Sequence, residues 1–388
     1  MEMAILNVFY LILLIALLVR LIEKVKSTSI KAFFKTNEPY MFLILCTIGI
    51  VPIFVMGVGV IANKSPSEIS ANTQLNISTF MAFLISFVWL LYVRKIDIYE
   101  KERWGHIIVT FIMGAFFSYF APIGYGIFSA FGVDLNNRPI NDFLYSIFII
   151  GGIEETVKIT PFLILLKYTK AADEPYDYIL YPSIAALGFA FVENISYINS
   201  SGLFNIGGRA LYSTVAHMVF SSVIGYGMLL SKFGITKRSK RLSFLFAFAI
   251  AAAMHGFYDY WLINDFVSSF SFITTLFFLA TIHIWFVLKN NAINMSNYYD
   301  PKTTLDNGGL KWYLIMSLSA VLMIGYLIVS YVYGMEWGNQ YLVQSWVAYG
   351  YIILYFSLSF SRYKIKHGRL SKIKVPLDFF IPKPIKRD

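Results

Sequence analysis

Long apolar stretches follow one another along almost the whole chain, and short polar connections separate them. Crossing the hydrocarbon core of a bilayer as a helix takes about 20 mostly apolar residues. The pattern therefore predicts an all-α, polytopic transmembrane helical bundle of about eleven spans. The predicted spans are residues 4–22, 41–61, 76–93, 107–132, 143–166, 179–198, 210–230, 242–262, 266–288, 312–333 and 341–361.

Composition agrees with this pattern. Of the 388 residues, 57% are hydrophobic and only 14% are charged, and the mean hydropathy is +0.63. Soluble domains carry about 25% charged residues. The chain is therefore expected to reside in a membrane, with the lipid bilayer as its surroundings.

The distribution of basic residues predicts an orientation, because cytoplasmic loops of membrane proteins are enriched in Lys and Arg. With the amino terminus outside, the outer connections contain only Lys64, Arg138 and Arg209, and nearly all other basic residues fall on the inner side. We therefore expect the N-terminus outside and the C-terminus in the cytoplasm. The net charge of +10 follows from the same rule. It favours contact with anionic lipid headgroups, and no nucleic acid partner is expected.

The longest polar gap between spans lies near residues 290–310 and is the best candidate for a boundary. We predict three parts. Residues 1–106 hold three N-terminal membrane helices, residues 107–289 form a membrane core, and residues 290–388 form a two-span extension with a basic cytoplasmic tail. No soluble domain is predicted, and no particular oligomeric state is indicated.

Ionisable residues inside the apolar stretches carry the strongest functional signal. Each costs about 2.5–3.5 kcal/mol at the centre of a membrane helix. Here they concentrate in the four consecutive spans between residues 143 and 262, as Glu154, Glu155, Lys158, Glu193, His217, His255 and Asp259. Such a cluster is expected to satisfy itself in one shared pocket, in the outer half of the bilayer, or to hold a ligand.

Helical spacing refines this expectation, since residues four apart share a face. His255 and Asp259 form such a pair, and so do Glu154 and Lys158. Glu154 and Glu155 diverge by about 100° around the helix axis. We therefore expect only one of these two glutamates to face the pocket squarely.

Two histidines with several carboxylates are suited to peptide hydrolysis by either of two routes. One uses a bound metal, with zinc as the expected ion and a glutamate as general base. The other uses water activated by a buried glutamate without metal. The same groups could also form a proton relay, so a proton-coupled transporter is an alternative, although the sequence lacks the inverted repeats typical of transporters.

Four segments resemble the motifs of the PrsW family of bacterial intramembrane proteases. They are "EETVK" (154–158), "GFAFVEN" (188–194), the isolated His217, and "HGFYD" (255–259). The family shares a clan with the CAAX prenyl endopeptidases and the bacteriocin-immunity proteases. The resemblance covers about residues 140–262, within the predicted core.

The resemblance implies an intramembrane endopeptidase in the bacterial cell membrane that cuts membrane-anchored protein substrates. In this family the implied substrates are anti-sigma factors, whose cleavage starts regulated intramembrane proteolysis. A non-catalytic scaffold of the same clan is a further alternative.

The resemblance also implies residue roles. Glu154 or Glu155 would act as general base, and Glu193, His217 and His255 would bind a metal or polarise the scissile carbonyl. Asp259 would be an auxiliary ligand, Asn194 a donor to the oxyanion, and Lys158 a partner that partly neutralises the glutamates.

Overall fold

The structure is a computed structural model that describes residues 19, 22, 70–361, 363 and 365–371. All regular structure in these residues is helical, and they contain no strand. The elements are α4 (Ala71–Lys95), α5 (Trp104–Ser118), α6 (Phe120–Ala130), α7 (Pro139–Tyr145), the π-helix η1 (Ser146–Gly151), α8 (Gly152–Tyr168), α9 (Asp177–Ser201), the 3₁₀-helix η2 (Leu203–Asn205), α10 (Ile206–Gly208), the π-helix η3 (Arg209–Ser213), α11 (Thr214–Lys232), α12 (Lys240–Ile263), the 3₁₀-helix η4 (Ser268–Phe270), α13 (Phe272–Asn294), α14 (Asn307–Tyr333) and α15 (Met335–Ser359).

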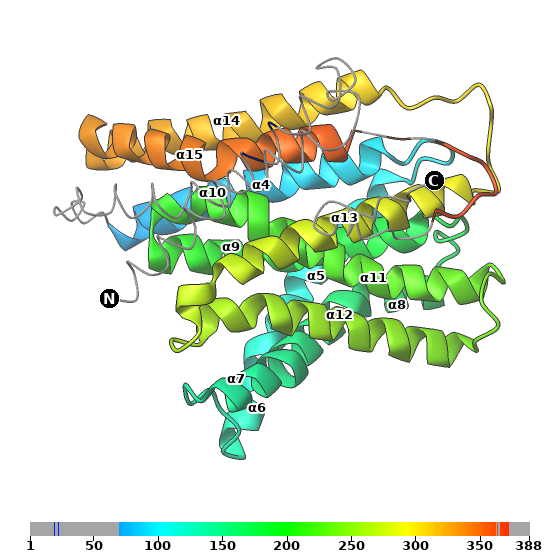
Figure 1. The fold of residues 1–388 in the computed structure, drawn as a ribbon, viewed down its shortest axis with the longest axis horizontal. Helices are drawn as coiled ribbons and strands as arrows, with labels where there is room; N and C mark the ends of the chain where they lie inside the picture. Colours follow the sequence, from blue (N-terminus) through cyan, green and yellow to red (C-terminus); the bar gives the residue numbers. More distant parts are fainter. Residues whose placement is uncertain (1–18, 20–21, 23–69, 362, 364, 372–388) are drawn as a thin grey trace, which may run out of the picture.

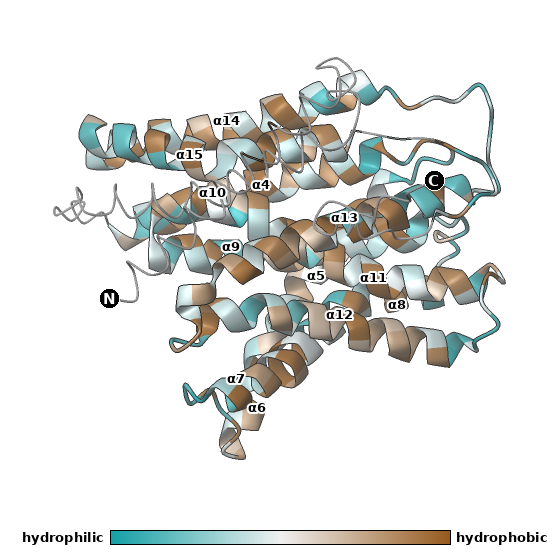
Figure 2. Ribbon diagram, viewed as in Figure 1, coloured by the Kyte–Doolittle hydropathy of each residue, from teal (hydrophilic) through white to brown (hydrophobic). Residues whose placement is uncertain are grey.

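Within the described residues, eight helices are long and apolar enough to cross a membrane. They span Ala71–Lys95, Trp104–Ala130, Asp177–Ser201, Leu203–Lys232, Lys240–Ile263, Phe272–Asn294, Asn307–Tyr333 and Met335–Ser359. The prediction of an all-α, multi-pass membrane protein is confirmed. Figure 2 shows the hydrophilic residues gathered mainly at helix ends and connecting loops.

Three of the eleven predicted spans differ from these eight helices. Spans 4–22 and 41–61 lie, apart from residues 19 and 22, outside the described part of the chain. The predicted span 143–166 is helical throughout, in α7, η1 and α8, but it is not among the eight. Its α8 portion has only 17 residues and contains two glutamates and two lysines, which lowers its hydropathy.

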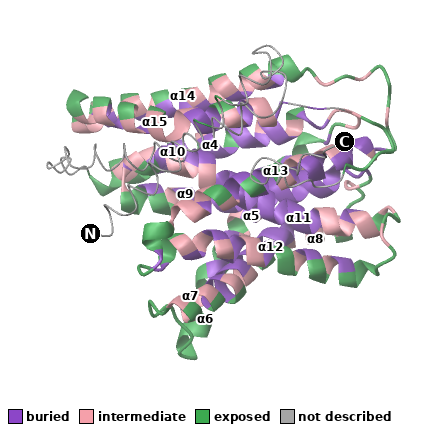
Figure 3. Ribbon diagram, viewed as in Figure 1, coloured by how far each residue is buried: buried purple, intermediate pink, exposed green. Residues whose placement is uncertain are grey.

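The helices form one bundle around α9 and α11 (Figure 1). Helices α4, α5 and α11 all pack against α9, and α12 packs against α11. Helix α14 pairs with α15 along one side of the bundle, while α6 and α7 project from the opposite side. Buried residues concentrate on α9 and α11, as Figure 3 shows. The core of the bundle therefore lies where the predicted polar cluster was expected.

Small residues allow the central helices to approach one another closely. A Cβ atom at Gly188 of α9 would collide with the carbonyl oxygen of Phe111 in α5. A Cβ at Gly225 of α11 would collide in the same way with Tyr178 of α9. Glycine at such contacts is the usual means of close helix packing in membranes, because lipid provides no hydrophobic drive for helix association.

Lys289 directly follows the predicted span 266–288, but the structure places it inside helix α13. It lies near the end of α13 with no exposed surface. Its ammonium donates to the hydroxyls of Tyr92 (3.2 Å) and Tyr363, and it lies 5.3 Å from the ring centre of Trp285. These contacts join α13 to α4 and to the segment after α15, and they replace the water that a loop lysine would have.

Candidate functional site

The acidic motif "EETVK" begins α8 directly after the π-helix η1. A π-helical turn inserts one extra residue, which rotates the following side chains about the helix axis. Such turns are frequent at functional sites. Packing holds this turn tightly, because a Cβ at Gly151 would meet the carbonyl oxygen of Ala252 and a Cβ at Gly256 would meet that of Ser146. The contact between η1 and α12 thus sets where the glutamates of α8 point.

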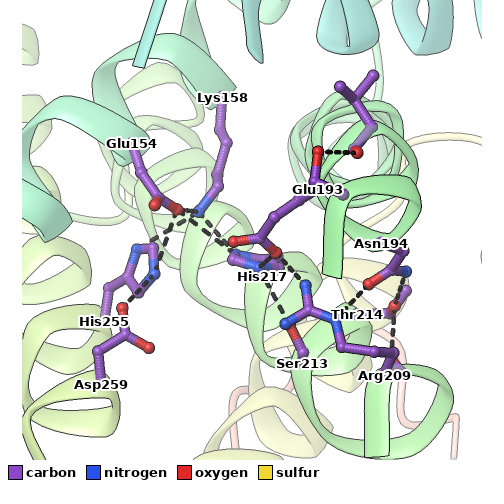
Figure 4. A network of polar contacts seen from close by, with 12 residues as sticks. Glu154, Lys158, Glu193, Asn194, Arg209, Ser213, Thr214, His217, His255 and Asp259 are labelled. Carbon is purple, nitrogen blue, oxygen red and sulfur yellow. Dashed lines mark hydrogen bonds and ion pairs between the residues drawn. The ribbon is translucent and has the colours of Figure 1, made fainter. Parts of the chain in front are cut away.

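Lys158 lies at the centre of the cluster (Figure 4). Its Nζ is 2.9 Å from Glu154 Oε2, 3.1 Å from Glu155 Oε1, 2.7 Å from His217 Nδ1 and 3.3 Å from His255 Nδ1. Lys158 and Glu155 have no exposed surface. Residues from α8, α11 and α12 therefore meet around one positive charge, which stabilises carboxylates that would otherwise be buried at high cost.

His217 follows the second π-helix, η3, and enters the cluster from α11. Its Nε2 is 2.8 Å from Glu193 Oε2 and 3.3 Å from Ser213 Oγ. The Phe189 ring lies 5.4 Å from the imidazole centre. Helix α9 thus supplies both a carboxylate and an apolar wall to this histidine.

His255 enters from α12 and contacts three carboxylates. Its Nδ1 is 3.0 Å from Glu155 Oε1, and its Nε2 is 3.4 Å from Glu154 Oε2 and 3.2 Å from Asp259 Oδ2. The predicted pairing of His255 with Asp259 is confirmed. The expectation that only one of Glu154 and Glu155 would face the site is wrong, because both contact His255, one at each ring nitrogen.

The side chains of the cluster differ in how far they are buried. Glu154, His217 and His255 are buried, with 7%, 5% and 1% of their surface exposed. The side chains of Glu193 and Asp259 are 20% and 22% exposed. Glu193 and Asp259 are therefore the more accessible carboxylates of the cluster.

Asn194 lies within the same region but points away from the histidines. Its Nδ2 donates to Thr214 Oγ1 at 2.9 Å, its Oδ1 accepts from Arg209 Nε at 2.6 Å, and the residue has no exposed surface. Its role as an oxyanion donor stays a prediction.

Arg209 was assigned to an outer connection from the sequence, but the structure places it beside the cluster. It begins η3, and its guanidinium pairs with the Glu193 carboxylate. The sequence signal was a lone basic residue at the start of an apolar stretch, eight positions before His217. That signal predicts an interfacial residue as readily as a site residue, so the sequence alone did not single it out.

Two hydroxyl groups complete the surroundings of the glutamate pair. Tyr125 of α6 donates to Glu154 Oε1 at 2.6 Å, and Ser221 of α11 donates to Glu155 Oε2 at 2.7 Å. Both oxygens of each glutamate are thus hydrogen-bonded or ion-paired. No motif spacing links Tyr125 to Glu154, because the contact depends on how α6 packs against α8.

The donor set fits a small divalent cation. Glu154, His217 and His255 each offer one ligand atom, and these three atoms lie within 4.8 Å of one another. Tetrahedral zinc with bonds of about 2.0–2.1 Å separates its ligand atoms by about 3.3 Å. Glu154 Oε2 is 3.4 Å from His255 Nε2 and 4.0 Å from His217 Nδ1. A cation would join these atoms only after the Lys158 ammonium, 2.9 Å from Glu154 Oε2 and 2.7 Å from His217 Nδ1, had moved aside.

Comparison with known proteins places this geometry in a family. The model of the PrsW family of intramembrane metalloproteases matches residues 102–287, which include every residue of the cluster. A protein named Protease PrsW from Oceanobacillus iheyensis is 31% identical over 182 residues, which cover 47% of this chain and 79% of the relative. The chain belongs to the PrsW family.

Two further relatives carry the same name. Protease PrsW of Clostridioides difficile is 27% identical over 236 residues, covering 60% of this chain and 95% of the relative. Protease PrsW of Geobacillus kaustophilus is 33% identical over 132 residues, covering 34% of this chain and 55% of the relative. No solved structure matches the chain.

Membership of the PrsW family confirms three predictions. The chain is a protease, it is a multi-pass protein of a bacterial membrane, and it belongs with the intramembrane metalloproteases. Protease activity is thereby favoured over the transporter and the non-catalytic scaffold. The roles of individual residues remain predictions.

Proposed function

We propose that this PrsW protein hydrolyses peptide bonds of membrane-anchored substrates at the centre formed by Glu154, His217 and His255. One observation carries the proposal. Three metal-ligating side chains from three different helices place their ligand atoms within 4.8 Å of one another inside a membrane bundle. Such groups are costly to bury and are retained when they perform chemistry.

Zinc is the metal we propose, held by Glu154, His217 and His255. Two imidazoles, one carboxylate and an open position are typical of catalytic zinc sites. When bound there, a zinc ion would lower the pKa of a water molecule and polarise the scissile carbonyl. The remaining groups of the cluster orient these ligands and move protons.

Carboxylates next to the two histidines hold the imidazoles in place. Glu193 contacts His217 at Nε2, and Glu155 contacts His255 at Nδ1. A carboxylate at one ring nitrogen fixes the tautomer and raises the basicity of the other nitrogen. Glu155 has no exposed surface and both its oxygens are bonded, so we assign it to orientation rather than proton transfer.

Asp259 is the carboxylate that we propose as proton acceptor if Glu154 binds the metal. It lies 3.2 Å from His255 Nε2, and its side chain is 22% exposed. Water adding to the carbonyl carbon would pass its proton to Asp259, which would then protonate the leaving amine. The sequence-based prediction that Glu154 or Glu155 is the general base is the competing assignment.

The substrates we propose are single-span membrane proteins, with anti-sigma factors as the implied class. Support comes from the family resemblance and from the position of the cluster within the bundle, where a substrate helix would have to unwind near the partly exposed Glu193 and Asp259. Cleavage there would be the first cut of regulated intramembrane proteolysis.

The three-part organisation also stays a proposal. The PrsW match ends at residue 287, before α14 begins at Asn307. This supports catalysis by the core 107–289 and an accessory role for the extension 290–388.

Cleavage by purified variants tests the proposed function. The wild-type protein and its Glu154→Gln and His255→Ala variants would be reconstituted with a single-span anti-sigma factor. Both variants should lose cleavage by about 100-fold or more, as removal of catalytic groups does. Glu336→Gln on α15 and His283→Ala on α13, both exposed, serve as matched controls and should retain it. Undiminished cleavage by both site variants would contradict the proposed catalytic site.

A further inference from the structure

We propose that Arg209 is a positioning residue that holds Glu193 against His217 and thereby presents His217 Nδ1 to the metal. The inference rests on the proposed function. Arg209 would touch neither substrate nor metal. It would act through Glu193, and its loss would weaken metal binding without removing a ligand.

The guanidinium of Arg209 is held by several groups. It pairs with the Glu193 carboxylate through Nη2 and donates from Nε to Asn194 Oδ1 at 2.6 Å. The ring of Tyr197 lies 4.2 Å from its central carbon. A planar donor fixed on two edges and one face has little freedom to turn, so the carboxylate that it holds is equally fixed.

The main chain of Arg209 closes this arrangement. Asn194 Nδ2 donates to Thr214 Oγ1 at 2.9 Å, and Thr214 Oγ1 donates to the carbonyl oxygen of Arg209 at 2.7 Å. Asn194 and Thr214 have no exposed surface. This closed ring joins α9 to η3, the π-helix that starts at Arg209. The π-turn therefore places the Arg209 guanidinium beside Glu193, which in turn contacts His217 of α11 (Figure 4).

The ring of contacts determines the hydrogen-bonding state of His217. Paired with a guanidinium, Glu193 is an ionised acceptor, so His217 Nε2 must donate to it at 2.8 Å. On the other side, the ammonium of Lys158 donates to Nδ1 at 2.7 Å, which requires a lone pair there. Both neighbours demand the same tautomer, protonated at Nε2. To bind this lone pair, zinc would have to displace the Lys158 ammonium from Nδ1, which lies 4.0 Å from Glu154 Oε2.

A purely structural ion pair would behave differently from a positioning residue. If Arg209 only joined α9 to α11, its removal would lower the melting temperature and leave the metal affinity of the folded protein unchanged. If it acts through Glu193, metal affinity falls in protein that is fully folded. Loss of a group that orients a metal ligand typically costs 10–100-fold in affinity.

The test measures zinc affinity of detergent-solubilised full-length protein by competition with a chromophoric chelator, with the melting temperature of each sample. Arg209→Gln should weaken zinc binding by about 10–100-fold. Arg209→Lys keeps the charge but loses the planar guanidinium that reaches both Asn194 and Glu193. Its zinc affinity should therefore lie between those of Arg209→Gln and the wild type. Arg138→Gln removes an exposed arginine from the connection before α7 and is the matched control, with unchanged affinity expected.

A double variant asks whether Arg209 acts through Glu193. Glu193→Gln should weaken zinc binding to a similar degree, and adding Arg209→Gln to it should cause no further loss. Additive losses would contradict the inference. If folded Arg209→Gln or Arg209→Lys bound zinc as tightly as the wild type, the role proposed for Arg209 would be wrong and the proposed metal site would stand. Failure of the wild-type protein to bind zinc would overturn it together with the proposed metal site.

Discussion

Glu193 Oε2 lies 2.8 Å from His217 Nε2, across the contact between α9 and α11. This pair joins the two central helices of the bundle at the depth of the histidine cluster. Helices α9 and α11 also pack closely at Gly225, so the two helices that hold the carboxylate and the imidazole are in direct contact. A rigid scaffold holding an orienting carboxylate is what a preorganised metal site requires.

Substitution of Glu154 and of Asp259 should separate metal binding from proton transfer. Glu154→Gln should reduce zinc affinity by more than about 100-fold, because it removes a proposed ligand. Loss of a group that only orients a ligand would cost less. Asp259→Asn should keep zinc but lose about 10²–10⁴-fold in kcat, because a neutral amide accepts no proton. Zinc content and cleavage rate measured on the same samples check both. Full zinc in Glu154→Gln with no cleavage would instead assign the base to Glu154.

Replacing Lys158 by Met should destabilise the fold. Without the ammonium, Glu155 remains buried and loses its nearest cation, and breaking one side of a buried ion pair costs about 3–5 kcal/mol. The thermal melting temperature in detergent should fall clearly. Lys237→Met, at an exposed position between α11 and α12, is the control and should melt like wild type. A Lys158→Met protein as stable as wild type would show that the cluster does not need its central charge.

Tyr125→Phe should lower kcat by about 10-fold with little change in KM. The hydroxyl donates to Glu154 Oε1 at 2.6 Å, and hydrogen bonds to charged groups contribute about 1.5–3 kcal/mol. The phenyl ring keeps the packing of α6, so the melting temperature should fall only by what the lost hydrogen bond contributes. Tyr119→Phe, with 65% of its surface exposed, is the matched control. Equal kcat in both variants would contradict a role for the Tyr125 hydroxyl.

Stability should fall as pH rises, through two buried carboxyl groups outside the membrane-spanning helices. Burial raises the pKa of Asp97 to about 7 and that of Glu174 to about 8. The folded protein therefore binds protons more tightly than the unfolded chain, whose carboxyl pKa values are near 4. The free energy of unfolding then decreases between about pH 4 and pH 8.

Melting temperatures measured from pH 5 to pH 9 check this dependence. The Asp97→Asn and Glu174→Gln variants should each show a shallower decline, because the removed group no longer ionises. Asp300→Asn, in the loop before α14, is an exposed control and should follow the wild type. A wild-type melting temperature that rises over this range would contradict the assignment.

Contacts within one helix were predictable from the sequence. The pairs Glu154 with Lys158 and His255 with Asp259 follow from four-residue spacing, and the structure contains both, at 2.9 and 3.2 Å. The apolar stretches likewise predicted most of the membrane helices, because about 20 apolar residues have no other stable place in a bilayer.

Contacts between helices could not be predicted from residue spacing along the chain. The pairing of Arg209 with Glu193 depends on the π-turn η3, whose extra residue the apolar pattern does not reveal. The contact of Tyr125 with Glu154 depends on the packing of α6 against α8, which residue spacing along the chain does not give. The angle of about 100° between Glu154 and Glu155 led to the wrong prediction that only one of them faces the site. Long side chains at neighbouring positions can contact the two ring nitrogens of one imidazole.

Metal analysis of the purified protein tests the central claim most directly. Elemental analysis of wild-type protein should find about one zinc ion per chain, as one three-ligand site predicts. His217→Ala and His255→Ala should lose it, and His283→Ala should keep it. Wild-type protein that cleaves its substrate with no bound metal, or equal zinc in all four samples, would contradict a metal centre at Glu154, His217 and His255.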